Sequence, residues 1–312
     1  MKKGEKILWC IKSVLPSTTK TCVWLLKITA GVSFAIMFLK YFKVLPVISG
    51  MLAPLFNFIG LPGEAALSFV TGYFVNVYAA ISVMVSLDLD IRALTILGTM
   101  VLSCHNMITE TAVQKKTGSS AVRIVITRTL SAFILAFFLN RFLPGQMVVA
   151  TGTAGVEDME FWVLFKEWLI STAGVIVKMT ILIYTLAIVQ KILAEFGVIR
   201  WVSKFLRPFL AIFGLPSRTS FLWIVANTLG LAYGAAVMME EVESGNVSGR
   251  DVNLLNVHIS VSHSNFEDLF LVSALGAMWY VMLLSRWMCS FVLVWELRAE
   301  YYIKDKLFKK NC

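Results

Sequence analysis

The chain has 312 residues, of which 58% are hydrophobic and 15% are charged, and its mean hydropathy is +0.78. Soluble domains are usually about 45–50% apolar and about 25% charged, so this composition excludes an ordinary soluble protein. The net charge of +9 does not indicate a nucleic-acid partner, because the lysines and arginines cluster at the ends of apolar segments, where they set orientation in a membrane.

The first half of the chain predicts three membrane spans. Residues 1–20 are basic and amphipathic, and we expect an interfacial helix that stays on the mature protein. A short segment at 44–62 is expected to be a second interfacial helix, and an interrupted apolar stretch follows at 63–86. Segments long enough to cross about 30 Å of hydrocarbon lie at about 22–42, 91–115 and 121–142.

The second half repeats this order after a polar segment, 146–165, that we expect to be an external loop. A basic amphipathic piece lies at 197–216, and an interrupted apolar stretch lies at 219–239. Residues 299–312 form a basic tail. The three expected spans lie at about 168–190, 252–275 and 278–297.

Matched spacings support an internal duplication covering residues 21–145 and 166–298. His105 corresponds to His263, and in both halves an acid (Glu110 and Asp268) follows the histidine by 5 residues, a glycine by 13 and an arginine by 23. Two segments ending in GLP, at 52–62 and 206–216, precede these positions. Several equal offsets in a row are typical of a sequence repeat.

The interrupted stretches are expected to be re-entrant hairpins that enter and leave the membrane on one side. Each half then has three spans, and an odd number inverts the second half relative to the first. This topology places Lys115, Lys116 and both basic termini in the cytoplasm. The predicted fold is an all-α polytopic protein of the cytoplasmic (inner) membrane, built from two inverted repeats. Each repeat has three transmembrane helices, an interfacial helix and a re-entrant hairpin.

Ionisable residues lie at the middle of two predicted spans. Such groups cost at least about 2.5–3.5 kcal/mol there, so they usually face a pathway inside the bundle. The candidate residues in the two spans are His105, Asn106, Glu110, His263, Ser264, Asn265, Glu267 and Asp268. The hairpin interruptions add Thr71, Asn76, Asn227 and Thr228. The alternative is that these groups only form hydrogen bonds between helices.

Helical spacing predicts which of these groups meet. His263 and Glu267 are four residues apart and would share a helix face. His105 and Glu110 are five apart, so they converge only if the helix breaks locally. Arg128 and Arg286 either pair with the nearby carboxylates or extend to the lipid headgroups.

A metal site built from His105, His263 and a carboxylate is chemically feasible, but it requires the two halves to converge. We expect no cofactor; the histidines and carboxylates allow coupling to Na⁺ or protons. The five cysteines are scattered and form no metal motif. The sequence contains no phosphate-binding loop, so we expect no nucleotide-driven step within this chain.

At GLPGEAALSFVTGYF, LSCHNMITE and VSHSNFEDLFLVSALGA the chain resembles the gate, or nucleoside-recognition, family of membrane proteins. That family includes spore maturation proteins A and B and the membrane part of ferrous-iron transport protein B. The resemblance covers roughly 45–140 and 200–297, and it implies two oppositely oriented gates around a central site. Two departures argue against iron transport: the GTPase domain is absent, and Ser262 corresponds to Cys104.

These features predict a secondary transporter or gated membrane pathway for a small polar or anionic solute that is nucleoside-like. The alternatives are a non-transporting membrane assembly subunit and a divalent-metal transporter. We expect no enzyme, because an intramembrane hydrolase would need a nucleophile beside a histidine and only Ser103 and Ser262 are nominally placed. The expected partners are a small-molecule substrate, membrane lipids, and either a second copy or another membrane subunit.

Overall fold

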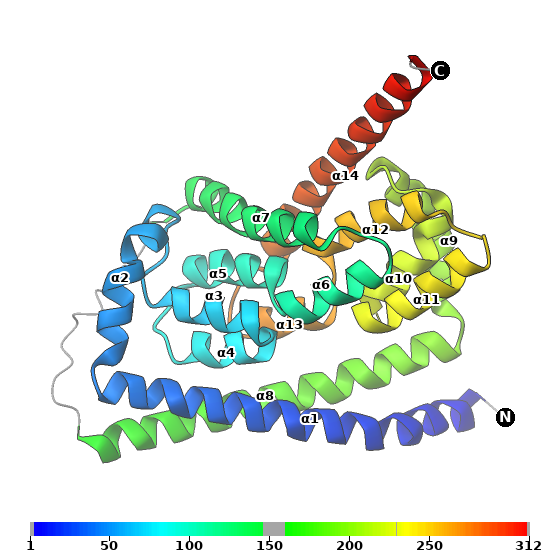
Figure 1. Cartoon of the computed structure of the whole chain (residues 1–312). Helices are drawn as coiled ribbons and strands as arrows, with labels where there is room; N and C mark the ends of the chain where they lie inside the picture. The colour runs from blue at the N-terminus through cyan, green and yellow to red at the C-terminus, as the bar shows by residue number, and fades with distance from the viewer. Residues whose placement is uncertain (1–2, 146–159, 229, 311–312) are drawn as a thin grey trace.

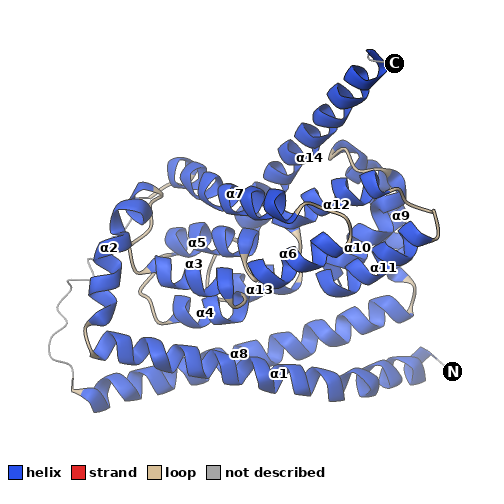
Figure 2. Cartoon of the chain, in the orientation of Figure 1, coloured by secondary structure: helices blue, strands red, loops and turns tan. Residues whose placement is uncertain are grey.

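The computed structural model describes residues 3–145, 160–228 and 230–310, and every regular element among them is helical (Figure 2). The predicted external loop at 146–165 therefore lies mainly outside the described residues. The first-half helices are α1 (Lys3–Tyr41), α2 (Val44–Phe58), α3 (Ala65–Phe74), α4 (Val77–Val85), α5 (Ile91–Cys104), α6 (Met107–Lys116) and α7 (Ala121–Phe142). The second-half helices are α8 (Phe161–Glu195), α9 (Val198–Ile212), α10 (Ser220–Thr228), α11 (Leu231–Glu243), α12 (Gly249–Ser262), α13 (Glu267–Ser273) and α14 (Trp279–Lys310), with a 3₁₀ turn at Ser217–Thr219.

Four helical segments of the described chain are long and apolar enough to cross a membrane. They are Ile91–Lys116, Ala121–Phe142, Phe161–Glu195 and Trp279–Leu307. They coincide with four of the six predicted spans, and the all-α, multi-pass character of the protein is confirmed. The segment at 252–275 is instead divided between α12 and α13, and the apolar part found within α1 is the shorter Thr29–Leu39.

Helices α1 and α8 form a long antiparallel pair along one side of the molecule (Figure 1). Near one end the Lys6 ammonium donates to the Glu195 carbonyl at 2.8 Å, and further along the hydroxyls of Thr19 and Tyr184 lie 2.7 Å apart. Residues 1–20 and the span at 22–42 were expected to be separate helices, whereas α1 is continuous from Lys3. Pro16 lies inside α1 without ending it.

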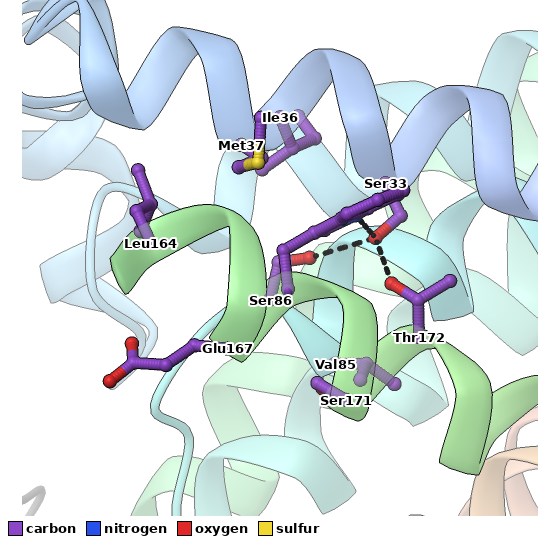
Figure 3. Close-up of a pocket in the computed structure, with 10 residues that line it drawn as sticks. Ser33, Ile36, Met37, Val85, Ser86, Leu164, Glu167, Ser171 and Thr172 are labelled. Atoms are coloured by element: carbon purple, nitrogen blue, oxygen red, sulfur yellow. Dashed lines mark hydrogen bonds between the residues drawn. The ribbon is translucent and has the colours of Figure 1, made fainter. Parts of the chain in front are cut away.

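A cavity of about 160 Å³ lies between α1, α4 and α8, well away from the predicted site. At its centre the Ser33 hydroxyl contacts Thr172 at 3.2 Å and accepts a hydrogen bond from the Trp168 indole at 3.0 Å. Figure 3 shows Ser33 pointing toward Thr172 and Ser86 across this space. These hydrogen bonds join α1 to α8 across the cavity.

Two large hydrophobic clusters fill the rest of the described structure. One centres on α3, α4 and α5, and the other on α10 and α12 with part of α14. Helices α5 and α12 pack against each other, and so do α7 and α14. The predicted site therefore lies where helices of the two halves meet.

Gly98 allows α5 to pack closely against α13 and α14, and we expect Gly98→Ala to destabilise the fold. A Cβ atom there would lie 2.7 Å from Val272 Cγ1 and 2.8 Å from Met282 Sδ. Overpacking of this kind costs about 1–3 kcal/mol. Thermal unfolding in detergent measures the change.

Gly174→Ala on α8 is the matched control, because a Cβ atom there meets nothing within 4 Å. Removing a helical glycine at such a position stabilises by about 0.5–1 kcal/mol. Equal effects of the two substitutions on the melting temperature would contradict the packing at Gly98.

Candidate functional site

Both predicted histidine spans are broken immediately after the histidine. Helix α5 ends at Cys104, and His105 is extended with ψ 161°. Helix α12 ends at Ser262, and His263 is extended with ψ 176°. The next residues, Asn106 and Ser264, take left-handed conformations with φ 51° and 52°. Asparagine tolerates this region because its short polar side chain hydrogen-bonds locally.

A buried arginine caps each broken helix. The Arg128 Nε donates to the Ser103 carbonyl at 3.1 Å, and its Nη2 donates to the His105 carbonyl at 2.8 Å. Arg286 makes the same two bonds in the second half, to Val261 at 2.7 Å and His263 at 2.6 Å. A helix end leaves carbonyls without partners, and these buried arginines supply the missing donors.

The short helix pairs α3–α4 and α10–α11 are tied to these breaks. The backbone N–H of Asn106 donates to the Gly72 carbonyl at 2.8 Å, at the end of α3. In the second half the Asn265 amide donates to the Asn227 side-chain oxygen at 2.7 Å and to the Ser262 carbonyl at 2.6 Å. Each break is therefore held by a neighbouring pair of short helices as well as by its arginine.

The two histidines converge on one carboxylate. The His105 Nε2 lies 3.3 Å from Glu110 Oε1, and the His263 Nε2 lies 3.1 Å from the same carboxylate. The ring centroids are 5.0 Å apart. Asp268 Oδ2 approaches His105 Nε2 at 3.2 Å. The local break brings His105 and Glu110 together, which a regular helix would not do.

The backbone fixes how each imidazole presents its nitrogens. The Nδ1 atoms of His105 and His263 lie 3.1 and 2.8 Å from the carbonyls of Val101 and Ile259. Because a carbonyl only accepts, we assign the Nδ1 protons to these bonds. The Nε2 atoms then either carry a lone pair or, when protonated, donate to the carboxylates.

Charges balance within the cluster. Arg128 Nη2 lies 2.8 Å from Glu110 Oε2 and forms a buried ion pair with it. Arg286 and Asp268 supply a second cation and a second anion, and the two carboxylate residues are only 8% and 6% exposed. The cluster is neutral when the histidines are neutral, and each added proton gives it one positive charge.

The same arrangement offers ligands for a metal ion. One ligand atom each from His105, Glu110 and His263 lies within 4.8 Å of the others, and all three residues are buried. Two histidines and a glutamate are a known zinc ligand set. The carbonyl bonds to both Nδ1 atoms are the kind of outer-shell contact that orients metal-binding histidines.

Several predicted residues lie outside the cluster. The expectation that His263 and Glu267 share a helix face is wrong, because the break falls between them and Glu267 accepts a hydrogen bond from the Tyr78 hydroxyl at 2.5 Å. Asn76 caps α4 by accepting from the Ala79 N–H at 2.9 Å. Thr228 bonds back to the Ile224 carbonyl of its own helix, and the Thr71 carbonyl accepts from Val75 at the end of α3. The two residues with left-handed backbone conformations also bond locally. The Asn106 side-chain oxygen accepts from the Thr109 hydroxyl, and the Ser264 backbone carbonyl accepts from the Leu269 N–H.

Sequence reasoning missed Tyr78 and His258. Tyr78 lies in an apolar run without a pattern that marks it. His258 is buried beside Ser262, whose hydroxyl lies 2.9 Å from its Nδ1, and the Trp223 indole lies 3.3 Å from the same atom. It precedes His263 by five residues in the same predicted span, and a second histidine in that span is the signal that could have identified it.

Comparison with known proteins identifies a relative of the same broad class. The uncharacterized membrane protein YvoD of Bacillus subtilis (strain 168) is 30% identical over 264 residues, which is 83% of this chain and 85% of YvoD. No protein-family model matches the chain. No solved structure matches it.

Proposed function

Because this chain belongs to the same membrane-protein family as YvoD of Bacillus subtilis, we propose that it is a proton-coupled secondary transporter. The solute is small and polar or anionic. The observation that carries this proposal is the convergence of two histidine Nε2 atoms on Glu110 at the junction of the two halves. The resemblance to the gate family, with its nucleoside-linked members, favours a nucleoside-like solute.

The paired geometry supports two inverted gate repeats. Each half has a helix that breaks after a histidine, an arginine that caps the break, and a pair of short helices bound to it. In Figure 1, α5 and α12 run in opposite directions, as do α7 and α14. Secondary transporters commonly place their site at such a repeat interface, with irregular backbone lining it. In this topology both chain termini lie in the cytoplasm.

Protonation supplies the coupling. With neutral histidines, Glu110 is held by Arg128, and the two arginines balance the charges of Glu110 and Asp268. Protonating either Nε2 adds a positive charge beside Glu110 and Asp268, and the site then attracts an anion more strongly. A solute anion that pairs with the arginines would release the carboxylates, and this exchange links solute binding to proton binding.

Uptake should be lost when either histidine is replaced. A thermal-shift panel of uridine, adenosine, succinate and Zn²⁺ on the purified protein selects the ligand, since a compound that binds only the folded state raises its melting temperature. Radiolabelled ligand is then followed into proteoliposomes under a proton gradient. His105→Ala and His263→Ala should abolish gradient-driven uptake. His258→Ala is the control, since His258 contacts Ser262 and Trp223 instead.

Normal uptake by His105→Ala and His263→Ala in well-folded protein would sink the transporter proposal. Circular dichroism and the elution volume in detergent establish folding for each variant. Loss of uptake in His258→Ala equal to that in the two site variants would assign the effect to packing.

A divalent-metal transporter is the second candidate, favoured by the three ligand atoms that lie within 4.8 Å. Isothermal titration of the purified protein with Zn²⁺ tests it directly. Removing one ligand with His263→Ala should weaken Zn²⁺ binding by about tenfold or more, comparable to the loss of a supporting contact around a metal site. Unchanged affinity in that variant would exclude this site as the metal site.

A further inference from the structure

The interface between α6 and α12 contains two buried side-chain oxygens without a protein partner. They are Gln114 Oε1 and Asn256 Oδ1, in residues that are 1% and 0% exposed. Leaving a buried polar group unbonded costs about 1–3 kcal/mol. Buried water commonly satisfies such groups. These two oxygens therefore point to water within this interface, which we call the α6–α12 seam.

A continuous set of polar contacts runs along this seam. The Gln114 amide donates to the Asn256 carbonyl at 3.1 Å. The Asn256 amide donates to Thr117 Oγ1 at 2.7 Å and to Ser119 Oγ at 2.9 Å. Ser119 donates to Asn253 Oδ1 at 2.6 Å. Polar atoms therefore follow one another for the whole length of the seam.

The outer end of the seam reaches the protein surface. The Asn253 amide donates to the Tyr301 hydroxyl at 2.6 Å. The guanidinium of Arg250 lies 5.1 Å from the Tyr301 ring centroid, and it also forms two hydrogen bonds with Asp305 at 2.8 Å. Both Arg250 and Asp305 are more than half exposed. Water can therefore enter at this end.

The inner end reaches the histidine cluster. Gln114 follows Glu110 by four residues on α6, so the two side chains lie one above the other on the same helix face. Glu110 lies 3.1 Å from the His263 Nε2. A water held by the Gln114 oxygen is therefore placed one helical turn from the carboxylate that both histidines share.

The equivalent positions in the other half are mostly apolar. The two histidines are 158 residues apart, and this offset relates Gln114 to Val272, Thr117 to Leu275, Ser119 to Ala277 and Asn256 to Gly98. Gly98 packs closely against Val272 and Met282. Asn253 corresponds to Thr95, which is polar. The Thr95 hydroxyl already donates to the Ile91 carbonyl and accepts from the Met278 N–H at 3.0 Å. This second interface therefore has no comparable path for water.

We propose that the α6–α12 seam is a hydrated route that carries protons between the surface at Arg250 and the His263–Glu110 pair, while its apolar counterpart is closed in this conformation. A proton arriving along the seam passes from water to the His263 Nε2 lone pair or to Glu110. The role in proton delivery rests on the proposed transporter function, but the hydration of the seam does not. Because the α6–α12 seam is polar and its counterpart is apolar, the histidine cluster would be connected to water on one side of the membrane only.

Thiol accessibility tests the route in the full-length chain, reconstituted in liposomes, with the five native cysteines replaced by alanine. The probe is Ag⁺, a thiol reagent small enough to follow water. The variants are Gln114→Cys and its matched control Val272→Cys, and unreacted thiols are counted with a maleimide after denaturation. A buried thiol away from water is inert, so Gln114→Cys should react about tenfold faster or more. Adding Asn256→Leu should remove that difference.

Equal rates for Gln114→Cys and Val272→Cys would overturn the route. If Gln114→Cys does not fold, Ser119→Cys against Ala277→Cys gives the same comparison, because both native residues are buried to the same extent. Because labelling needs no solute, loss of the transporter proposal leaves this result intact. Conversely, gradient-driven uptake together with equal labelling would exclude the seam and leave the transporter proposal standing. Uptake is also measured in Asn256→Leu with the native cysteines present, and uptake unchanged from the parent would exclude proton delivery through the seam.

Discussion

Arg128→Ala is expected to lower the free energy of unfolding by about 3–5 kcal/mol, the usual cost of removing one partner of a buried ion pair. The Arg128 side chain is completely buried. It pairs with Glu110 and donates to the carbonyls of Ser103 and His105. The substitution leaves a buried carboxylate and two terminal carbonyls without the donor that Arg128 supplies.

Arg123→Ala on the same helix is the control. Arg123 forms salt bridges with Glu296 and Glu300, but its side chain is 30% exposed. Exposed pairs contribute about 0–1 kcal/mol, so the loss should be several times smaller than at Arg128. Urea titration in mild detergent, followed by tryptophan fluorescence, compares the two variants.

Arg128→Lys separates charge from geometry. Lysine keeps the positive charge beside Glu110, but its single ammonium does not reproduce the planar arrangement of Nε and Nη2 donors that reaches two carbonyls at once. We expect a stability between those of the parent and the alanine variant. A lysine variant as stable as the parent would show that the caps on the broken helix contribute little.

Hydropathy and spacing predicted a substantial part of this molecule. The spans at 121–142 and 278–297 are predominantly apolar, and such segments form helices in lipid because each backbone group must be bonded internally. The equal 23-residue separation of histidine and arginine in the two halves predicted equivalent positions for Arg128 and Arg286. The structure gives these two side chains the same pair of backbone bonds.

The helix breaks could not be predicted from local preference. Asn106 tolerates a left-handed conformation, but Ser264 has no strong preference for one, and the segment 252–275 has the periodicity of a continuous helix. The groups that stabilise each break lie elsewhere in the chain. They are an arginine 23 residues after the histidine and a carbonyl or amide group of a neighbouring short helix. The same breaks separate Glu267 from His263, and Glu267 instead meets Tyr78, a contact spanning 189 residues.

Glu110→Gln should have the largest effect on proton-coupled uptake, a loss of about 100-fold, equivalent to about 2.7 kcal/mol at 1.36 kcal/mol per factor of ten. Glu110 contacts His105, His263 and Arg128 together. A glutamine has nearly the same shape, but it carries no charge and replaces one acceptor oxygen with a donor. It therefore neither stabilises a protonated histidine nor balances the arginine.

Glu267→Gln provides the comparison, because Glu267 accepts from Tyr78 and lies next to Asp268 in the chain without contacting either cluster histidine in the described structure. Proton entry into liposomes is followed with an internal pH-sensitive dye while the selected solute is added outside. We expect Glu110→Gln to elute and melt as a single species, which would establish that it folds, yet to lose proton entry and uptake by about the same 100-fold. Glu267→Gln should retain both, because its neutral amide still accepts from the tyrosine. If the two variants retain equal activity, Glu110 is not the proton-binding group, and the convergence of the two histidines on it has only a structural role.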